Sequence, residues 1–246
     1  MTKLLTLNVE GRKHYPRVLH LIETEKPTIV CLQELPEKFL SQLRARGYLT
    51  SFLPMFIKTD AQGSYVVGIG IASTFPFLAT GSYYYRGSPN IVHFDQKRKK
   101  ETSSFGFIAA EIKINSDCFR VVTTHLVDTE HGQTDSFQTQ LLAKLLTELD
   151  QLPPHLLCGD FNMPRGFNSL YPKITNFYTD AIPRHYKSSL DQSLHRLGTA
   201  TLDEPIFEKY MVDYIFTKPP YTLKTVGLRF GVSDHAAVVA ELSETK

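Results

Sequence analysis

Apolar residues recur along the chain in two spacings, and each spacing predicts one kind of secondary structure. Runs such as KLLTLNV at residues 3–9 and TIVCLQEL at 28–35 are short and mostly apolar, as in strands that are buried on both faces. From Thr134 to Asp150, the apolar residues fall three and four positions apart, which predicts an amphipathic helix. The chain is therefore expected to contain both buried strands and helices that cover them.

The order of these elements indicates a mixed α/β fold. The first strand is followed by a helix that Pro27 ends, then by the strand at 28–35 and a short helix that Gly47 ends. Further strand patterns are SYVVGIGIAS (64–73), FGFIAAEIKI (105–114), FRVVTTHL (119–126), YMVDYIFT (210–217), TVGLRF (225–230) and AAVVAEL (236–242). Residues 165–205 are polar and irregular, and we expect them to form an insertion that borders the functional site.

Length and composition narrow the class of protein. The chain has 246 residues, of which 42% are hydrophobic, so it can bury a large core. No repeat or long linker divides it, and we expect a single domain over residues 1–246 that acts as a monomer. Its formal charge of +2 does not by itself indicate binding to a polyanion. No apolar run approaches the roughly 20 residues that span a bilayer, so we expect a soluble, cytoplasmic protein without stable membrane insertion.

Polar residues with catalytic potential stand near the ends of the strand-like runs. HLLCGDFNMP at 155–164 is the clearest case, because a buried-looking strand ends on Asp160 and Asn162. Residues i and i+2 of a strand point to the same side, so these two side chains are expected to face one spot. Asp, Asn and Pro also form turns, and a simple turn is the alternative interpretation of this stretch.

Other strand-like runs carry polar residues at corresponding places. These residues are Asn8, Glu34, His125, Asp213, Asp234 and His235. Taken singly, Asn8 can cap a turn, and Glu34 can precede a helix. His125 and Asp213 can be hydrogen-bonded core residues. Buried acids are rare unless they are paired or bind a metal, however, and strand ends of layered α/β proteins converge on ligand sites, so the whole set predicts an active site.

The chemistry of this set suits hydrolysis of a phosphate ester. The Glu34 carboxylate and the Asn8 amide oxygen match a hard cation, Mg²⁺ or Mn²⁺. Asp160 can orient or deprotonate the attacking water, and Asn162 can donate to a phosphoryl oxygen. The three cysteines form no CxxC pair, and no cluster of histidines suggests a zinc site.

Near the C-terminus, Asp234 directly precedes His235 in the stretch SDHAAV. Adjacent residues of a regular strand point to opposite faces, so their side chains can interact only where the backbone bends, which Gly231 and Ser233 permit. An imidazole that an aspartate orients is a common catalytic pair, and we therefore predict that Asp234 and His235 act together.

Six motifs, in this order, resemble those of the endonuclease/exonuclease/phosphatase superfamily over nearly the whole chain. They are LTLNVEG, VCLQEL, TTHL, GDFNMP, VDYIF and SDHAAV. The resemblance implies a four-layer α/β sandwich, in which two packed mixed β-sheets carry helices on both outer faces. TTHL is closer to the histidine-bearing branch of tyrosyl-DNA phosphodiesterases, deadenylases and sphingomyelinases than to the exonuclease III group, which has a tyrosine-centred motif there.

The resemblance also implies roles for the polar residues. Glu34 would hold a divalent cation with help from Asn8. The catalytic set would consist of Asp160, Asn162, His125, Asp213, Asp234 and His235. Within that set, Asp160 would position the water, while the other members would contact the phosphate or support those that do.

Two further stretches bear on the substrate. DQKRKKE places Lys97 and Arg98 in a basic run, and SYYYRG places Tyr84 and Arg86 in a loop or hairpin tip. Basic side chains can follow phosphates while aromatic rings stack on bases, so we expect these four residues to contact a nucleic acid, DNA in particular. Alternatively, the basic run is a solvated loop and the tyrosines belong to an ordinary strand.

The sequence therefore predicts a Mg²⁺- or Mn²⁺-dependent phosphodiesterase that acts on a nucleic acid or a nucleotide-linked phosphodiester. A lipid or inositol-phosphate hydrolase is the alternative enzyme. A binding scaffold that has lost catalysis is an alternative of another class, and the intact set of acids, amides and imidazoles argues against it.

Overall fold

Two six-stranded β-sheets pack face to face in the computed structural model, which describes residues 2–198 and 206–243. The first sheet contains β1 (Lys3–Asn8), β2 (Ile29–Pro36), β3 (Leu49–Asp60), β4 (Gly63–Ser73), β11 (Leu223–Arg229) and β12 (Ala237–Leu242). The second contains β5 (Phe77–Arg86), β6 (Phe105–Ile114), β7 (Asp117–His125), β8 (Leu156–Asp160), β9 (Thr179–Asp180) and β10 (Asp213–Thr217). The strand orders are β11-β12-β1-β2-β4-β3 and β5-β6-β7-β8-β10-β9.

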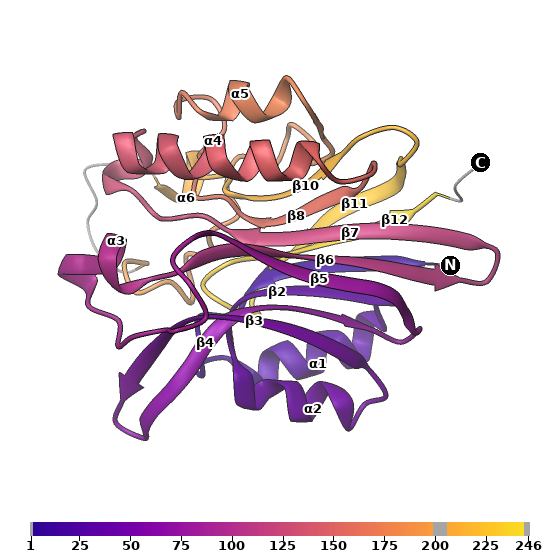
Figure 1. Ribbon diagram of the computed structural model, residues 1–246, viewed down its shortest axis with the longest axis horizontal. Coiled ribbons are helices and arrows are strands. Elements are labelled where there is room, and N and C mark those ends of the chain that lie inside the picture. The colour runs from indigo at the N-terminus through magenta and orange to yellow at the C-terminus, as the bar shows by residue number, and fades with distance from the viewer. Residues whose placement is uncertain (1, 199–205, 244–246) are drawn as a thin grey trace.

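Helices cover the outer face of each sheet (Figure 1). The first sheet carries α1 (Tyr15–Glu25), the short 3-10 helix η1 (Glu37–Phe39) and α2 (Leu40–Arg44), and the second carries α4 (Ser136–Asp150) and α5 (Tyr171–Thr175). The connections contain η2 (Gln96–Arg98), α3 (Lys99–Thr102), η3 (Glu130–Gly132) and α6 (Ile206–Lys209). The predicted four-layer α/β sandwich is thereby confirmed. No helix of the described residues is long and apolar enough to cross a membrane.

The alternation of side chains along β1 shows how this architecture builds a site. Leu5 and Leu7 pack in the core beneath α1 and α2, whereas Leu4 belongs to the core between the two sheets. Asn8, four residues after Leu4, also faces the second sheet, where its amide meets Asp160. A strand with a period of two thus carries an apolar residue into the core and a polar one to the end of the same face.

Two strands differ from the sequence prediction. The tyrosine-rich stretch belongs to β5, an edge strand, so the alternative interpretation of that stretch is the correct one. β3 is absent from the predicted strands because Pro54 interrupts its apolar stretch and its two ends are polar. A proline is tolerated there because β3 is an edge strand, whose pairing with β4 shifts register between Pro54 and Phe56.

The long helix agrees closely with its prediction. The pattern from Thr134 to Asp150 corresponds to α4, which begins at Ser136. Asp135 caps it, because its Oδ1 accepts a hydrogen bond of 2.7 Å from the backbone N–H of Gln138. The buried residues Leu141, Leu142 and Leu145 then face the second sheet.

Candidate active site

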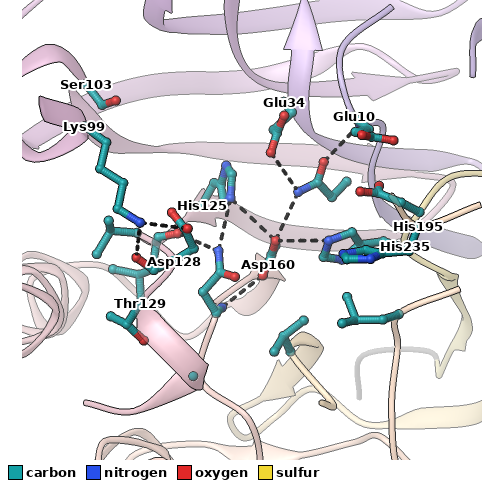
Figure 2. Close-up of a pocket in the computed structure, with 18 of the residues that line it drawn as sticks. Glu10, Glu34, Lys99, Ser103, His125, Asp128, Thr129, Asp160, His195 and His235 are labelled. Carbon is teal, nitrogen blue, oxygen red and sulfur yellow. Dashed lines mark hydrogen bonds and ion pairs between the residues drawn. The ribbon is translucent and has the colours of Figure 1, made fainter. Parts of the chain in front are cut away.

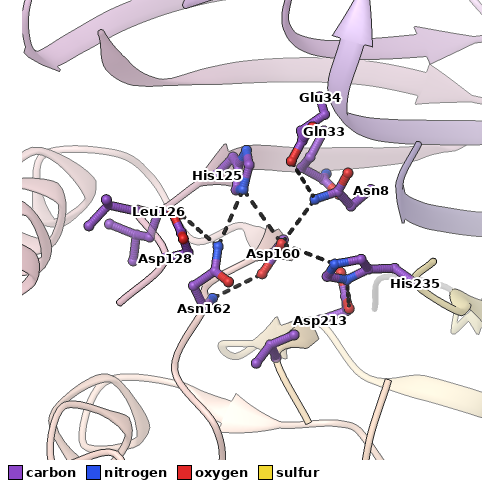
Figure 3. A network of polar contacts seen from close by, with 12 residues as sticks. Asn8, Gln33, Glu34, His125, Leu126, Asp128, Asp160, Asn162, Asp213 and His235 are labelled. Carbon is purple, nitrogen blue, oxygen red and sulfur yellow. Dashed lines mark hydrogen bonds and ion pairs between the residues drawn. The ribbon is translucent and has the colours of Figure 1, made fainter. Parts of the chain in front are cut away.

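Polar side chains from both sheets meet at one end of the sandwich, where the parallel pairs β1–β2 and β7–β8 have their carboxyl ends (Figure 3). They border a pocket of about 560 Å³. Its base is formed by the predicted residues Asn8, Glu34, His125, Asp160, Asn162, Asp234 and His235. Asp213 lies directly behind this base, in contact with His235. The structure therefore brings together all eight side chains that the sequence assigned to the site.

Asp160 is the centre of this arrangement. Its Oδ2 accepts a hydrogen bond of 3.0 Å from Asn8 Nδ2 and lies 3.5 Å from His125 Nε2 and 3.9 Å from His235 Nε2. The side chain is 1% exposed. Burial alone would raise the pKa of Asp160, but the charge of His235 and the contact with His125 outweigh it and hold that pKa below its usual value. Asp160 is therefore a carboxylate at neutral pH.

A turn, rather than strand alternation, brings Asn162 to the site. β8 ends at Asp160, and Asn162 has a φ of 50° in the following loop. The backbone N–H of Asn162 donates to Asp160 Oδ1 over 2.9 Å, as in an Asx turn. The Asn162 amide donates to the Leu126 carbonyl over 2.9 Å and lies 3.4 Å from His125 Nε2. The turn alternative is thus correct, and the turn itself brings Asn162 beside Asp160 and His125.

Gly159, directly before Asp160, occupies a position where a side chain would clash. Gly159 has a φ of 143°, and a Cβ at that position would stand 2.0 Å from the carbonyl oxygen of Thr124 in β7. The close approach of these two strands keeps the Asp160 and His125 side chains adjacent, since His125 pairs with Asp160 in the parallel register. A larger residue at 159 would separate the acid from the imidazole.

Glu34 reaches the pocket through an irregularity in β2. The pairing of β2 with β4 shifts register between Leu32 and Leu35, and Glu34 has a φ of 48°. Its carboxylate lies 3.5 Å from Asn8 Nδ2 and 3.7 Å from Lys58 Nζ. The bulge therefore turns Glu34 toward the pocket, while Gln33 stays between the sheets and donates to Thr123 over 3.0 Å.

Asn8 has a different orientation from the one predicted. Its Nδ2 donates toward both Glu34 and Asp160, and its Oδ1 accepts from the backbone N–H of Glu10 over 3.1 Å. In this arrangement the amide nitrogen, and not the oxygen that was predicted to face a cation, points toward the two carboxylates. The reason is electrostatic, because two neighbouring carboxylates are stabilised by a donor between them.

The sequence predicted that His235 pairs with Asp234. In the structure His235 pairs with Asp213 instead. His235 Nδ1 lies 2.7 Å from Asp213 Oδ2, whereas Asp234 accepts a hydrogen bond of 3.0 Å from the hydroxyl of Ser233. Asp234 and His235 are neighbours in the chain whose side chains take different partners. β10 instead carries Asp213 beneath the imidazole, opposite Asp160 in the antiparallel register with β8.

This pairing sets the charge of the imidazole. Burial would lower the pKa of His235, but the carboxylates of Asp213 and Asp160 outweigh it and raise that pKa well above its usual value. Burial raises the pKa of Asp234 to about 6. The base of the pocket thus combines an ionised Asp160, an imidazolium at His235 and an aspartate, Asp234, with a raised pKa.

The donor set fits a hard divalent cation. Glu34 and Asp160 present carboxylate oxygens on either side of the Asn8 amide, and no cysteine lies among the described pocket residues. Asp160, Asp213 and His235 offer a second group of ligand atoms within 4.8 Å of one another. Asp213 Oδ1 is buried and accepts no hydrogen bond from any described residue. Oxygen-rich coordination is therefore available, with Glu34 its most open member.

A family model described as the Endonuclease/Exonuclease/phosphatase family matches residues 5–235. The chain belongs to that family. The resemblance of the six motifs is thereby confirmed, and membership of the endonuclease/exonuclease/phosphatase family supports phosphoesterase activity. No curated protein matches the chain significantly in sequence.

Solved structures of the endonuclease/exonuclease/phosphatase family share this fold at low identity. A family protein from Beutenbergia cavernae has a TM-score of 0.75 and 17% identity, covering 99% of this chain and 71% of its own. Human Nocturnin with a bound sulfate anion has a TM-score of 0.72 and 19% identity, covering 99% and 93%. TDP2 from D. rerio, complexed with a single strand DNA product, has a TM-score of 0.69 and 17% identity, covering 98% of each chain.

The residues that the sequence predicted for substrate binding do not line the pocket of this endonuclease/exonuclease/phosphatase protein. The Tyr84 hydroxyl donates to the Pro54 carbonyl over 2.7 Å, so it is used within the sheet. Arg98 pairs with Glu101 at 2.6 Å, and Arg86 packs over the Phe137 ring. Lys97 belongs to the exposed surface of η2. These four residues therefore lie outside the pocket lining, and their contact with a nucleic acid stays a prediction.

Lys99, from the same basic run, does line the pocket. Its Nζ donates to the carbonyl of Asp128 over 2.8 Å and lies 2.7 Å from the Asp128 carboxylate (Figure 2). Phe94 and Phe56 line the same pocket, with ring centroids 4.9 Å apart. Backbone hydrogen bonds join Phe94 to Ile57 of β3 over 2.8 Å, so this aromatic wall is held to the sheet.

The opposite wall comes from the insertion that the sequence placed between residues 165 and 205. His195 and Arg196 line the pocket there, and Figure 2 shows His195 beside His235. The prediction that this segment borders the site is therefore confirmed for its described part. Neither residue stood out in the sequence, since no periodicity or motif marks a loop that is folded by contacts with distant strands.

Proposed function

We propose that this protein is a Mg²⁺- or Mn²⁺-dependent phosphodiesterase that hydrolyses a phosphodiester of a nucleic acid or of a nucleotide-linked substrate. The observation that carries the proposal is the contact of one buried, ionised carboxylate, Asp160, with two imidazoles, His125 and His235. An acceptor for the attacking water and two donors for a phosphoryl group thus stand within one pocket.

Asp160 orients the water in this mechanism. Its lowered pKa makes it a weak base but a good hydrogen-bond acceptor, because it stays ionised. Asn8 and the backbone N–H of Asn162 hold its two oxygens in place. A water bound to this carboxylate is therefore fixed in direction before the phosphate arrives, which lowers the entropic cost of attack.

His235 and His125 stabilise the charge that develops on the phosphoryl oxygens. Asp213 accepts from one nitrogen of His235 and leaves the other, Nε2, facing the pocket. Burial would lower the pKa of His125, but Asp160 raises it, so this imidazole is also favoured in its charged form. Two charged donors in a partly desolvated site stabilise a pentacoordinate phosphate better than water does.

Glu34 is the residue that we propose to hold the divalent cation. Its carboxylate is 25% exposed toward the pocket, and its pairing with Lys58 at 3.7 Å is loose enough to be displaced. When bound, the cation would supply Lewis-acid stabilisation of the phosphoryl oxygens. The orientation of Asn8 implies that its amide supports Glu34 and Asp160 as a hydrogen-bond donor.

The walls of the pocket support a nucleotide-containing substrate. Phe56, Phe94 and Phe105 give one wall an aromatic surface, with Gln96 and Ser103 as polar neighbours. Aromatic side chains stack on bases, and amide or hydroxyl groups can bond base edges. TDP2 from D. rerio, which has the same fold, was solved with a single strand DNA product. A lipid would use the apolar surface but leave these polar groups without partners.

Cleavage of a substrate panel tests the proposal. The panel comprises single- and double-stranded DNA, RNA, a tyrosyl-linked oligonucleotide, sphingomyelin and an inositol polyphosphate, each with Mg²⁺, Mn²⁺ or EDTA. We expect cation-dependent cleavage of an oligonucleotide, lost in His235→Ala and retained in His20→Ala, whose histidine is exposed on α1. Turnover of only the lipid or the inositol phosphate would contradict the substrate class, and cation binding without turnover would favour a scaffold.

A further inference from the structure

The loop at residues 188–198 is fastened to the strand end that carries His235. The Ala236 N–H donates to the Ser189 carbonyl over 2.7 Å, and Leu190 forms an isolated antiparallel bridge with His235. The Asp191 N–H donates to the Asp234 carbonyl over 2.8 Å. The loop therefore extends the strand end as a short added strand, and its position relative to His235 is fixed by backbone hydrogen bonds.

Asp191 then shapes the rest of the loop. Its Oδ1 accepts from the N–H of Ser193 over 2.9 Å and from the Ser193 hydroxyl over 2.6 Å, while its Oδ2 accepts from the Gly231 N–H. Its carbonyl accepts from the His195 N–H over 2.9 Å. This buried aspartate thereby holds the turn that presents His195 and Arg196 to the pocket. The turn is organised in advance of any ligand.

The charge pattern of the pocket singles out Arg196. Three lysines that line the pocket are each paired with a carboxylate: Lys13 with Glu10, Lys58 with Glu34, and Lys99 with Asp128. Arg196 lines the same pocket and is exposed, and it makes no ion pair with any described residue. A guanidinium in this state can bind an anion without first giving up a partner. Its planar fork matches two oxygens of a phosphate.

We propose that Arg196 binds a second phosphate of the substrate, on the His235 side of the phosphate that is cleaved. The inference rests on the proposed function, because it takes the scissile phosphate to lie over Asp160 and His235. The pocket then has two sides with different preferences. The aromatic wall takes a base, and the loop at 188–198 takes a neighbouring phosphate, which is either the next phosphodiester of a strand or a terminal phosphate.

Short thymidine oligonucleotides test this inference. TpT has one phosphodiester, TpTpT adds a second phosphodiester, and pTpT and TpTp add a terminal phosphate at either end. In wild type we expect a lower KM for a substrate with a second phosphate than for TpT. In Arg196→Gln we expect the ratio of the KM for TpT to the KM for a substrate with a second phosphate to shrink about tenfold. We expect kcat to change much less, because the contact is a binding contact. Arg44→Gln, an exposed arginine on α2, is the matched control and should keep the ratio.

The four substrates separate the two sources of the phosphate. If Arg196→Gln changes the KM ratio only for TpTpT, the contact is with the next phosphodiester of a strand. If it changes the KM ratio for pTpT or TpTp, the contact is with a terminal phosphate. An equal effect of Arg196→Gln on TpT and on the longer substrates, or none on any, would overturn the inference. A binding measurement tests the contact of Arg196 independently of catalysis. Fluorescently labelled TpTpT and pTpT should bind His235→Ala about tenfold tighter than His235→Ala/Arg196→Gln. Equal binding to both proteins would also overturn the inference, even if no turnover is found.

Discussion

The base and the walls of the pocket are built in opposite ways. At the base, Asp160 and Asp213 are almost fully buried on adjacent strands, and each side chain is fixed by hydrogen bonds to others of the set. The walls come largely from connecting segments, and their charged residues, such as Lys99 and Arg196, are partly or fully exposed. In the proposed function, the base therefore carries the chemistry, which needs fixed geometry, and the walls carry the choice of substrate.

The difference predicts a gradient of effects. Changes at the base should act on kcat, because they remove interactions that are strongest in the transition state. Changes in the walls should act on KM, because they remove contacts that ground state and transition state share. Four substitutions, given in order of decreasing expected effect, test this division.

Asp160→Asn should have the largest effect, a loss of about 10³-fold or more in kcat, because the amide cannot replace the charge that orients water and holds two imidazoles. Asp180→Asn is the matched control, since the Asp180 side chain is also 1% exposed and lies 2.9 Å from Arg165. Neither Asp180 nor Arg165 lines the pocket. Asp180→Asn should cost about 3 kcal/mol in the free energy of unfolding and leave kcat near wild type. Steady-state kinetics and urea unfolding measure both. A comparable loss of kcat in the two variants would break the division.

Asp213→Asn should lower kcat by about 10²-fold and shift the pH profile. The negative charge of Asp213 raises the pKa of His235, so its removal lowers that pKa. In the proposed mechanism, wild-type activity depends on the imidazolium and should fall as pH rises through the raised pKa. The alkaline limb of the variant should therefore lie at lower pH. The pH dependence of kcat/KM from pH 5 to 10 tests this, and an unmoved alkaline limb would show that His235 does not act as a charged donor.

Phe94→Ala tests the aromatic wall. We expect KM for an oligonucleotide to rise about tenfold while kcat stays within about twofold, since base stacking on an aromatic side chain contributes about 1–3 kcal/mol. For bis(p-nitrophenyl) phosphate, which has no base, the effect should be smaller. Phe177→Ala is the control, because Phe177 is 53% exposed outside the pocket lining. A fall in kcat without a rise in KM would instead place Phe94 among the residues that support the base.

Lys99→Met should have the smallest effect, a rise in KM of about threefold, because it removes the pairing with Asp128 that fastens the aromatic wall to the loop after His125. The side chains of the pair are 21% and 58% exposed, so the free energy of unfolding should change by less than about 1 kcal/mol. Raising the salt concentration should reduce the difference from wild type, since exposed charges are screened. A larger loss in kcat than in KM would assign Lys99 to the chemistry.

The sequence was informative wherever a local rule applies. Strand periodicity and the polar residues at strand ends were enough to place Asn8, Asp160 and His125 at one site, because parallel strands bring their carboxyl ends together. The same local rule also placed Asn162 at the site, but the structure brings it there by a turn with positive φ and not by strand alternation. Tyr84 was expected in a loop or hairpin tip, whereas it lies in β5 and its hydroxyl donates to a neighbouring strand.

Local patterns in the sequence were enough to predict the polar groups of the site, the layered α/β fold and the family, because these depend on short motifs and on periods of two or 3.6 residues. The partner of His235, the direction of Glu34 and the residues of the walls became known only from the packing of the folded chain. Asp213 pairs with His235 through the register of β10 on β8 and through the packing of one sheet on the other. Such contacts join residues far apart in the chain, and no local pattern encodes the distance between them.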